Sequence, residues 1–150
     1  MAVLQMDELR KLATPEPTYS EAERETIYRA LIYTAKTLSS LGHDAAIDAT
    51  GNLRRWRELA RREIAPFAEV YLRCPLDVAI RREKKRMKRR GAPAGIYAKA
   101  KAGWPVPGVA APYEEPLAPE LVIDTDRTGI RESARLIDGL LRRLAKNRRW

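Results

Sequence analysis

The chain has almost none of the residues that build disulfides or zinc sites. Its 150 residues include one cysteine, Cys74, and one histidine, His43. A single cysteine excludes an internal disulfide and suits a reducing compartment. A single histidine leaves no cluster of His and Cys side chains with the spacing that binds zinc. We therefore expect neither a disulfide-stapled scaffold nor a metal held by protein side chains.

Long hydrophobic runs are also missing. No apolar stretch reaches the ~18 residues needed to span a bilayer. The opening segment, MAVLQMDELRKL, has acidic residues almost at once and lacks the apolar centre of a secretory signal. These observations predict a protein that does not associate with membranes and is cytoplasmic.

Basic residues are in excess, and the formal net charge is +9. This charge favours anionic partners, which include nucleotides, sulfated or phosphorylated small molecules and nucleic acid, without choosing among them. Eight of the ten residues from 81 to 90 are Lys or Arg. Such a run is usually solvated; the alternatives are a basic flap over phosphates or a nucleic-acid patch. No aromatic residue lies within it, so a stacking platform for single strands is not indicated.

Short apolar runs alternate with amphipathic helical patterns. We expect strands at residues 2–5, 44–50, 69–72 and 121–124, and helices at 6–10, 21–41, 53–64, 75–87, 96–101 and 130–144. Such alternation predicts an α/β fold in which a mostly parallel sheet is flanked by helices. The run 44–50 is expected to be a buried strand. The length of the chain suits one domain, residues 1–150.

The longest expected helix has a clear start and one apolar face. Ser20 and Glu23 form a capping-box pattern, in which the serine accepts a backbone N–H and the glutamate reaches back. Apolar spacing predicts one buried stripe on this helix and one on the last helix. The expected stripe residues are Ile27, Leu31, Thr34, Leu38 and Leu41, and then Ile130, Ala134, Ile137, Leu141 and Leu144.

The stretch from Gly95 to Thr125 is the most distinctive part of the chain. A short helical pattern leads into a loop with five prolines, and an apolar run with Asp124 and Thr125 closes it. Proline stiffens the loop and removes backbone donors, so this segment cannot join a sheet. Loops of this length are uncommon unless they are functional or disordered. We interpret 84–119 as a basic insertion followed by an irregular lid.

The motifs IYAKAKAG, VPGV, PYEEP and PELVIDT occur here in the order and at close to the spacing of the substrate lid of adenylylsulfate kinase. MDELR, YSEAER and VYLRCPLDVAIRRE are similar to further blocks of that family. The chain therefore resembles the adenylylsulfate kinase family of P-loop enzymes over nearly its whole length. These enzymes transfer the γ-phosphoryl group of ATP, with Mg²⁺, to the ribose 3′-hydroxyl of adenylylsulfate in sulfate assimilation.

The resemblance implies roles for individual residues. Tyr19 would stack on the adenine of the substrate, and Arg10 and Arg24 would hold its phosphosulfate. From the residues alone, a staple on the helix and a surface charge are the alternatives for Tyr19 and Arg24. The lid would contribute Lys101, Val106 and Gly108. Arg82 and Thr125 would lie near the ATP cofactor.

Two carboxylates are candidates for catalytic work. Asp7 matches an Asp of the family's LDGDNVR block, and it shares one side of a helical turn with Arg10. Asp48 ends an expected strand, where ligands of open α/β sheets bind. It could order a metal-bound water or orient a hydroxyl; capping the next helix is an equal alternative.

The chain contains no GxxxxGK(S/T) phosphate-binding loop. In the family this loop and its strand, which is central in the sheet, precede the block that matches Met6–Arg10. We therefore expect an adenylylsulfate kinase-like domain that lacks its N-terminal nucleotide-binding segment and is inactive alone. A missing segment or a second chain would supply the loop; the family is often dimeric. Two alternatives stay open: a degenerate adenine-nucleotide-binding module of another small P-loop kinase type, and a basic nucleic-acid-binding protein.

Overall fold

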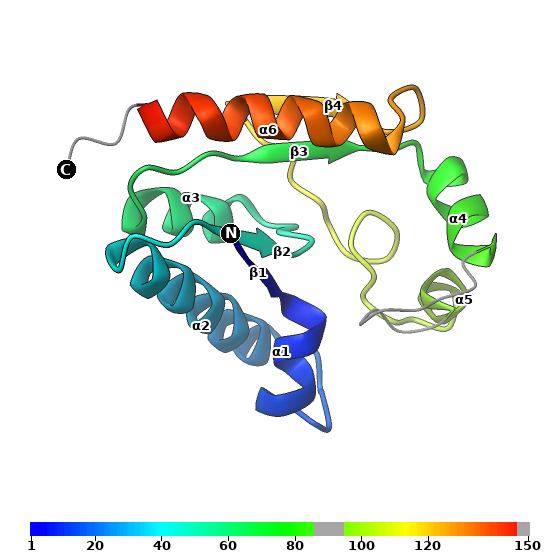
Figure 1. Cartoon of the computed structure of the whole chain (residues 1–150). Coiled ribbons are helices and arrows are strands. Elements are labelled where there is room, and N and C mark those ends of the chain that lie inside the picture. Colours follow the sequence, from blue (N-terminus) through cyan, green and yellow to red (C-terminus); the bar gives the residue numbers. More distant parts are fainter. Residues whose placement is uncertain (86–94, 147–150) are drawn as a thin grey trace. The chain divides into compact units, whose positions relative to one another are not determined.

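The computed structural model describes residues 1–85 and 95–146. The chain divides into two compact units, each built from two separated segments (Figure 1). The first unit comprises Met1–Ala65 and Lys88–Tyr113, and the second comprises Pro66–Met87 and Glu114–Trp150. Half of the basic run, residues 86–90, lies outside the described residues; 81–85 belong to a helix of the second unit. None of the described helices is long and apolar enough to cross a bilayer.

The first unit contains a two-stranded parallel sheet with helices packed on it. Strand β1 (Ala2–Gln5) pairs with β2 (Ala45–Asp48) in a register that places Gln5 beside Asp48. Helix α1 (Met6–Ala13) continues directly from β1, and α2 (Glu21–Ser40) packs on α1, β2 and α3 (Arg54–Glu63). The short helix α5 (Ile96–Lys101) also belongs to this unit.

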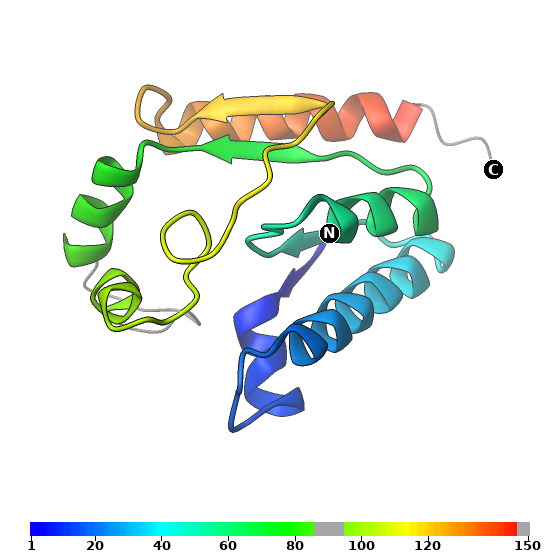
Figure 2. The same ribbon diagram turned by 180° about the vertical axis from the view of Figure 1, so that it is seen from behind.

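The second unit repeats the same pattern on a smaller scale. Strand β3 (Val70–Arg73) pairs in parallel with β4 (Leu121–Asp124), and Arg73 lies opposite Asp124. Helix α4 (Leu76–Lys85) follows β3, and α6 (Ile130–Lys146) lies along the strand pair (Figure 2).

Parallel strands flanked by helices confirm the expected fold class. In the described residues, however, the strands form two separate pairs instead of one sheet. Each pair therefore has edges whose N–H and C=O groups are outside a ladder. The run predicted as a buried strand is only half-buried at Ala45–Ile47, because a two-stranded sheet leaves much of each strand uncovered.

The predicted helix stripes were right in period and partly wrong in position. In α2 the buried residues are Ile27, Tyr28, Leu31, Ile32 and Ala35. Thr34 is exposed, and Leu41 is 68% exposed beyond the end of the helix. Ile130 of α6 is 90% exposed, whereas Leu140 is buried. Spacing of three and four residues fits several overlapping stripes, and packing against neighbouring elements selected the one that contains Tyr28.

Tyr28 joins α2 to the loop that follows β2. Its ring stacks on Trp56 with centroids 4.8 Å apart and planes 8° apart. Its hydroxyl accepts a 2.9 Å hydrogen bond from the Gly51 N–H, and burial raises the pKa of Tyr28. Gly51 has a φ of 55°, which favours glycine. This contact fixes the backbone three residues after Asp48.

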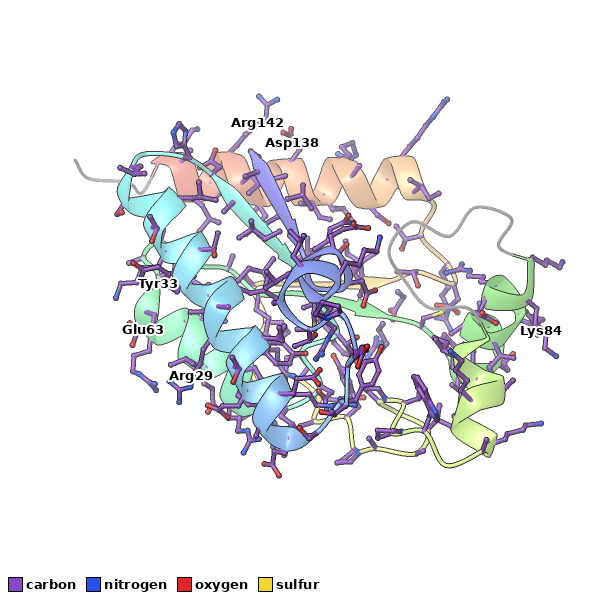
Figure 3. The ribbon with its side chains drawn as sticks, turned by 90° about the horizontal axis from the view of Figure 1, so that it is seen from below. Arg29, Tyr33, Glu63, Lys84, Asp138 and Arg142 are labelled. Carbon is purple, nitrogen blue, oxygen red and sulfur yellow. The ribbon has the colours of Figure 1, made fainter. Side chains whose placement is uncertain are left out.

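We expect Tyr28→Phe to destabilise the fold. The change leaves the buried Gly51 N–H without its acceptor, which costs about 1–3 kcal/mol. Urea denaturation followed by circular dichroism measures this loss. The matched control is Tyr33→Phe, because Tyr33 lies on the same helix and is 72% exposed (Figure 3). Equal midpoints for the two variants would contradict the structural role of the Tyr28 hydroxyl.

Candidate functional site

The carboxyl ends of β1 and β2 bring Asp7 and Asp48 into one electrostatic environment. The Gln5 amide donates a 3.0 Å hydrogen bond to Asp48 Oδ2, and Asp7 follows in the first turn of α1. Burial raises the pKa of Asp7 above its ordinary 3.8, and the negative charge of Asp48 adds to this rise. The positive charge of Arg10 lowers the pKa of Asp7 but does not cancel the effect of burial. A carboxylate with a raised pKa at the carboxyl end of a parallel strand is typical of a functional site.

Arg10 is the most buried charged side chain of this region. It is 7% exposed and forms an ion pair with Glu23. Its guanidinium carbon also lies 5.1 Å from the centroid of the Tyr19 ring, a cation–π contact. One side chain of α1 therefore contacts both the first turn of α2 and Tyr19, which lies two residues before that helix.

Glu23 organises the segment before α2. Its Oε2 accepts hydrogen bonds from the Thr18 N–H at 2.6 Å, the Thr18 hydroxyl at 2.7 Å and the Tyr19 N–H at 3.2 Å. Burial opposes ionisation, but the hydrogen bonds from Thr18 and the Arg10 guanidinium outweigh it and lower the pKa of Glu23. The Ser20 hydroxyl accepts a hydrogen bond from the Glu23 N–H, as the capping box predicts. The Glu23 carboxylate in turn bonds to Thr18 and Tyr19.

Tyr19 is held in an uncommon backbone conformation. Its φ is 55°, and no other described residue apart from glycine has a positive φ. Arg24 stabilises it from the helix side, because its Nε donates to the Tyr19 carbonyl at 3.0 Å. Nη2 of the same guanidinium donates to the Pro105 carbonyl, also at 3.0 Å. Strained residues that persist under such bonding cluster at functional sites.

The proline-rich loop is tied to the first unit at two places. Arg24 holds Pro105, and the buried Asn52 donates from Nδ2 to the Pro112 carbonyl at 3.1 Å. Between them the Val106 carbonyl accepts the N–H groups of residues 109, 110 and 111. Gly108 has a φ of 77°, which favours glycine at this turn. The predicted Lys101 ends α5 and is exposed.

Sequence reasoning did not single out Trp104. Its ring contacts Tyr19 with centroids 5.2 Å apart and planes 52° apart. The Lys99 ammonium lies 4.5 Å from its ring centroid. The available signal was a tryptophan placed in a Gly- and Pro-rich loop, where no core requires it.

The second unit contains the two residues predicted to bind the cofactor, and it brings them together. Arg82 Nη2 donates to the Thr125 carbonyl at 2.7 Å, and Nη1 lies 3.3 Å from the Thr125 hydroxyl. Next to them Arg73 binds Asp124 through two hydrogen bonds of 2.5 and 3.0 Å. Both contacts lie at the carboxyl ends of β3 and β4.

Two features that commonly hold the phosphates of ATP or a metal ion are missing from the sequence and from the described residues. No group of three or more His, Cys, Asp or Glu side chains within residues 1–85 and 95–146 could hold a metal. The sequence also has no glycine-rich loop followed by Lys and Ser or Thr, which are the groups that wrap phosphates and ligate Mg²⁺.

Solved structures of known kinases share this fold. The APS kinase of Mycobacterium tuberculosis, solved in complex with AMPPNP and APS, matches with a TM-score of 0.74 and 32% identity over 93% of this chain and 79% of that one. A sugar kinase from Janibacter is only 17% identical, with a TM-score of 0.64, and shows the fold alone. The fold and the likeness to the solved APS kinase place the protein in the P-loop kinase superfamily.

Proteins that are similar in sequence identify the family within this superfamily. Residues 1–124 match the family described as adenylylsulphate kinase. A probable adenylyl-sulfate kinase of Archaeoglobus fulgidus is 38% identical, covering 83% of this chain and 76% of the relative. One from Pyrococcus abyssi is 37% identical, covering 90% and 74%. The chain belongs to the adenylylsulfate kinase family, as the lid motifs indicated.

We expect Glu23→Gln to lower the free energy of unfolding at pH 7 by about 1.5–3 kcal/mol, because charge-assisted hydrogen bonds are lost. The pKa of Glu23 is below its ordinary 4.5 in the folded protein. Its contribution is therefore complete above that value and is lost as the pH falls through the folded pKa. Urea midpoints measured down to about pH 3 should converge for the two proteins. Glu25→Gln, which removes an exposed pair with Arg29 on the same helix, should change stability little. A constant difference at all pH values would contradict this account.

Asp7→Asn should have the opposite effect. Because the pKa of Asp7 is raised, its ionised form destabilises the folded state at neutral pH. The variant should therefore unfold at higher urea concentration at pH 7, and the gain should vanish once the pH falls below the ordinary value of 3.8. Asp138→Asn is the matched control, since Asp138 is an exposed partner of Arg142 on α6 (Figure 3). A less stable Asp7→Asn protein would contradict this account of the half-buried Asp7 carboxylate.

Proposed function

We propose that the chain forms the acceptor site of an adenylylsulfate kinase and binds adenylylsulfate in its first unit. The cluster of Arg10, Tyr19 and Arg24 supports this proposal most directly. These residues gather an aromatic ring and two guanidinium groups around one strained backbone position. A planar base with an anionic substituent is the ligand class for which these groups are suited.

The adenine stacks on Tyr19, and the phosphosulfate is held by the guanidinium groups. Arg24 donates from Nε to the Tyr19 carbonyl and from Nη2 to the Pro105 carbonyl. Its remaining N–H donors and its positive charge bind the phosphosulfate. Arg10 uses Nη1 in its pair with Glu23, and it holds the phosphosulfate through its other guanidinium donors. Val106 and Gly108 approach the ligand from the proline-rich loop, and Lys101 does so from the end of α5.

Asp7 accepts the proton of the ribose 3′-hydroxyl. Its raised pKa makes it a better base than an ordinary surface carboxylate. Asp48, oriented by the Gln5 amide, helps to align the same hydroxyl. In the second unit, Arg82 and Thr125 contact the ATP cofactor.

The 150-residue chain by itself does not transfer phosphoryl groups. Without backbone amides that wrap the phosphates, a loop lysine and a Mg²⁺ ligand, most of the positioning and charge stabilisation is absent. A segment that carries GxxxxGK(S/T), either in the same protein or in a partner chain, brings ATP and Mg²⁺. Its strand can pair with an open edge of one of the two-stranded sheets.

Calorimetric titration tests the acceptor site. Wild type should bind adenylylsulfate, and Arg24→Ala should bind it about tenfold or more weakly, because a charge-assisted contact is lost. Arg29→Ala is the matched control: Arg29 lies on the same helix, and its exposed side chain pairs only with Glu25 among the described residues (Figure 3). No binding by the wild type, or equal binding by the Arg24→Ala protein, would remove the acceptor-site proposal.

A coupled kinase assay tests the absence of turnover. The purified 150-residue chain with adenylylsulfate, ATP and Mg²⁺ should give no phosphorylation above background. Adding a segment with the phosphate-binding loop should restore it. Turnover by the chain alone would overturn this part of the proposal and leave acceptor binding unaffected.

A further inference from the structure

The middle of the proline-rich loop is held by hydrogen bonds within the loop itself. The Val106 carbonyl accepts the N–H groups of residues 109, 110 and 111, and the Gly108 N–H donates to the Ala111 carbonyl at 2.8 Å. We call this segment, residues 106–111, the loop turn; Figure 2 shows it as a curl of the ribbon between α5 and β4. A loop that is closed by its own bonds keeps its shape. The position of the loop turn therefore depends on what holds its two ends.

The two ends of the loop turn are held unequally. Before it, the Pro105 carbonyl accepts a 3.0 Å hydrogen bond from Arg24 in an exposed position. After it, the Pro112 carbonyl accepts a 3.1 Å hydrogen bond from Nδ2 of Asn52, a residue that is only 5% exposed. A hydrogen bond sheltered from water is stronger than an exposed one, because water does not compete for the donor and the acceptor. The Pro112 end is therefore the firmer attachment.

The position of Asn52 is set by the core of the first unit. The preceding residue, Gly51, donates its N–H to the Tyr28 hydroxyl at 2.9 Å, and its carbonyl accepts a hydrogen bond from Arg57. A Cβ at Gly51 would lie 3.4 Å from the Arg57 side chain, so the turn and α3 are in close contact. The Arg57 guanidinium carbon also lies 5.8 Å from the centroid of the Tyr113 ring. Side chains of α2 and α3 thus fix the backbone next to Asn52, and α3 contacts the residue that follows Pro112.

We propose that Asn52 is a positioning residue of the acceptor site and the pivot of the loop turn. Its amide keeps the loop turn attached at Pro112 while the exposed bond from Arg24 breaks and re-forms. The loop turn then moves as one body about Pro112, and it places Val106 and Gly108 against the ligand when both ends are attached. This inference rests on the proposed function and adds to it a residue that does not touch the ligand.

The first test needs no ligand. Nuclear magnetic resonance relaxation of backbone ¹⁵N nuclei reports fast motion of individual N–H groups, and it is measured over the loop turn in the full chain. Arg24→Ala should increase motion mainly near Pro105. Asn52→Asp keeps the shape of the side chain but has no N–H donor when ionised, and it should increase motion throughout the loop turn. Asn52→Ala, which removes the donor without adding a charge, should behave in the same way. An effect of the Asn52 variants that is equal to or smaller than that of Arg24→Ala would overturn the pivot.

The second test measures the rates at which adenylylsulfate binds and leaves. Asn52→Asp and Asn52→Ala should lower the affinity about fivefold, the factor that one ordinary hydrogen bond contributes. The loss should come from faster dissociation, with little change in the association rate constant. Ile64→Val is the control for lost stability, because it shrinks a buried side chain at the end of α3. It should change neither rate constant.

Dissociation at the wild-type rate in both Asn52 variants, or the same acceleration in Ile64→Val, would contradict the positioning role of Asn52. If the wild type binds no adenylylsulfate, the proposed function fails. The relaxation measurements on the free protein then still decide whether Asn52 is the pivot of the loop turn, so the two failures are distinguishable.

Discussion

The partly buried ion pair between Arg10 and Glu23 is the constraint on which the candidate site depends. Arg10 is fixed by α1, directly after β1, and Glu23 by the first turn of α2. Removing one partner of such a pair leaves a buried charge without compensation. The pair therefore sets the position of the segment between the two helices. Glu23 then bonds the N–H groups of Thr18 and Tyr19, and Arg10 meets the Tyr19 ring.

From Tyr19 the order extends to a part of the chain far away in sequence. Arg24, one residue after Glu23, bonds the Tyr19 and Pro105 carbonyls with one guanidinium. Asn52 fixes the other end of the loop at Pro112. Because donors from α2 and from the turn before α3 satisfy these carbonyls, the proline-rich segment has a defined place in the first unit without joining a sheet. The position of this segment is therefore set by side chains of α2 and of the turn before α3.

Several features of the first unit oppose stability and favour binding. Asp7 carries a raised pKa, Tyr19 a strained φ, and Trp104 an exposed indole. If stability alone mattered, a neutral side chain in place of Asp7, an unstrained backbone at Tyr19 and a polar side chain in place of Trp104 would be more favourable. Their common location, near the carboxyl end of the β1–β2 pair and along the adjoining loop, is the pattern expected when strain and charge serve a ligand.

The sequence by itself determined the order of strands and helices, the capping residue Ser20 and the family, because hydrophobic periodicity, caps and motifs are local properties. Only the tertiary structure decided which face of α2 is buried, that the strands form two pairs, and that Arg24 bonds two carbonyls. The contact of Trp104 with Tyr19 was also visible only in the tertiary structure. The spacing of apolar residues indicates which of them lie on the same face of a helix. The element that packs on this face lies elsewhere in the chain, so spacing does not identify it. Contacts between residues as distant as Tyr19 and Trp104 exist only once the backbone has folded.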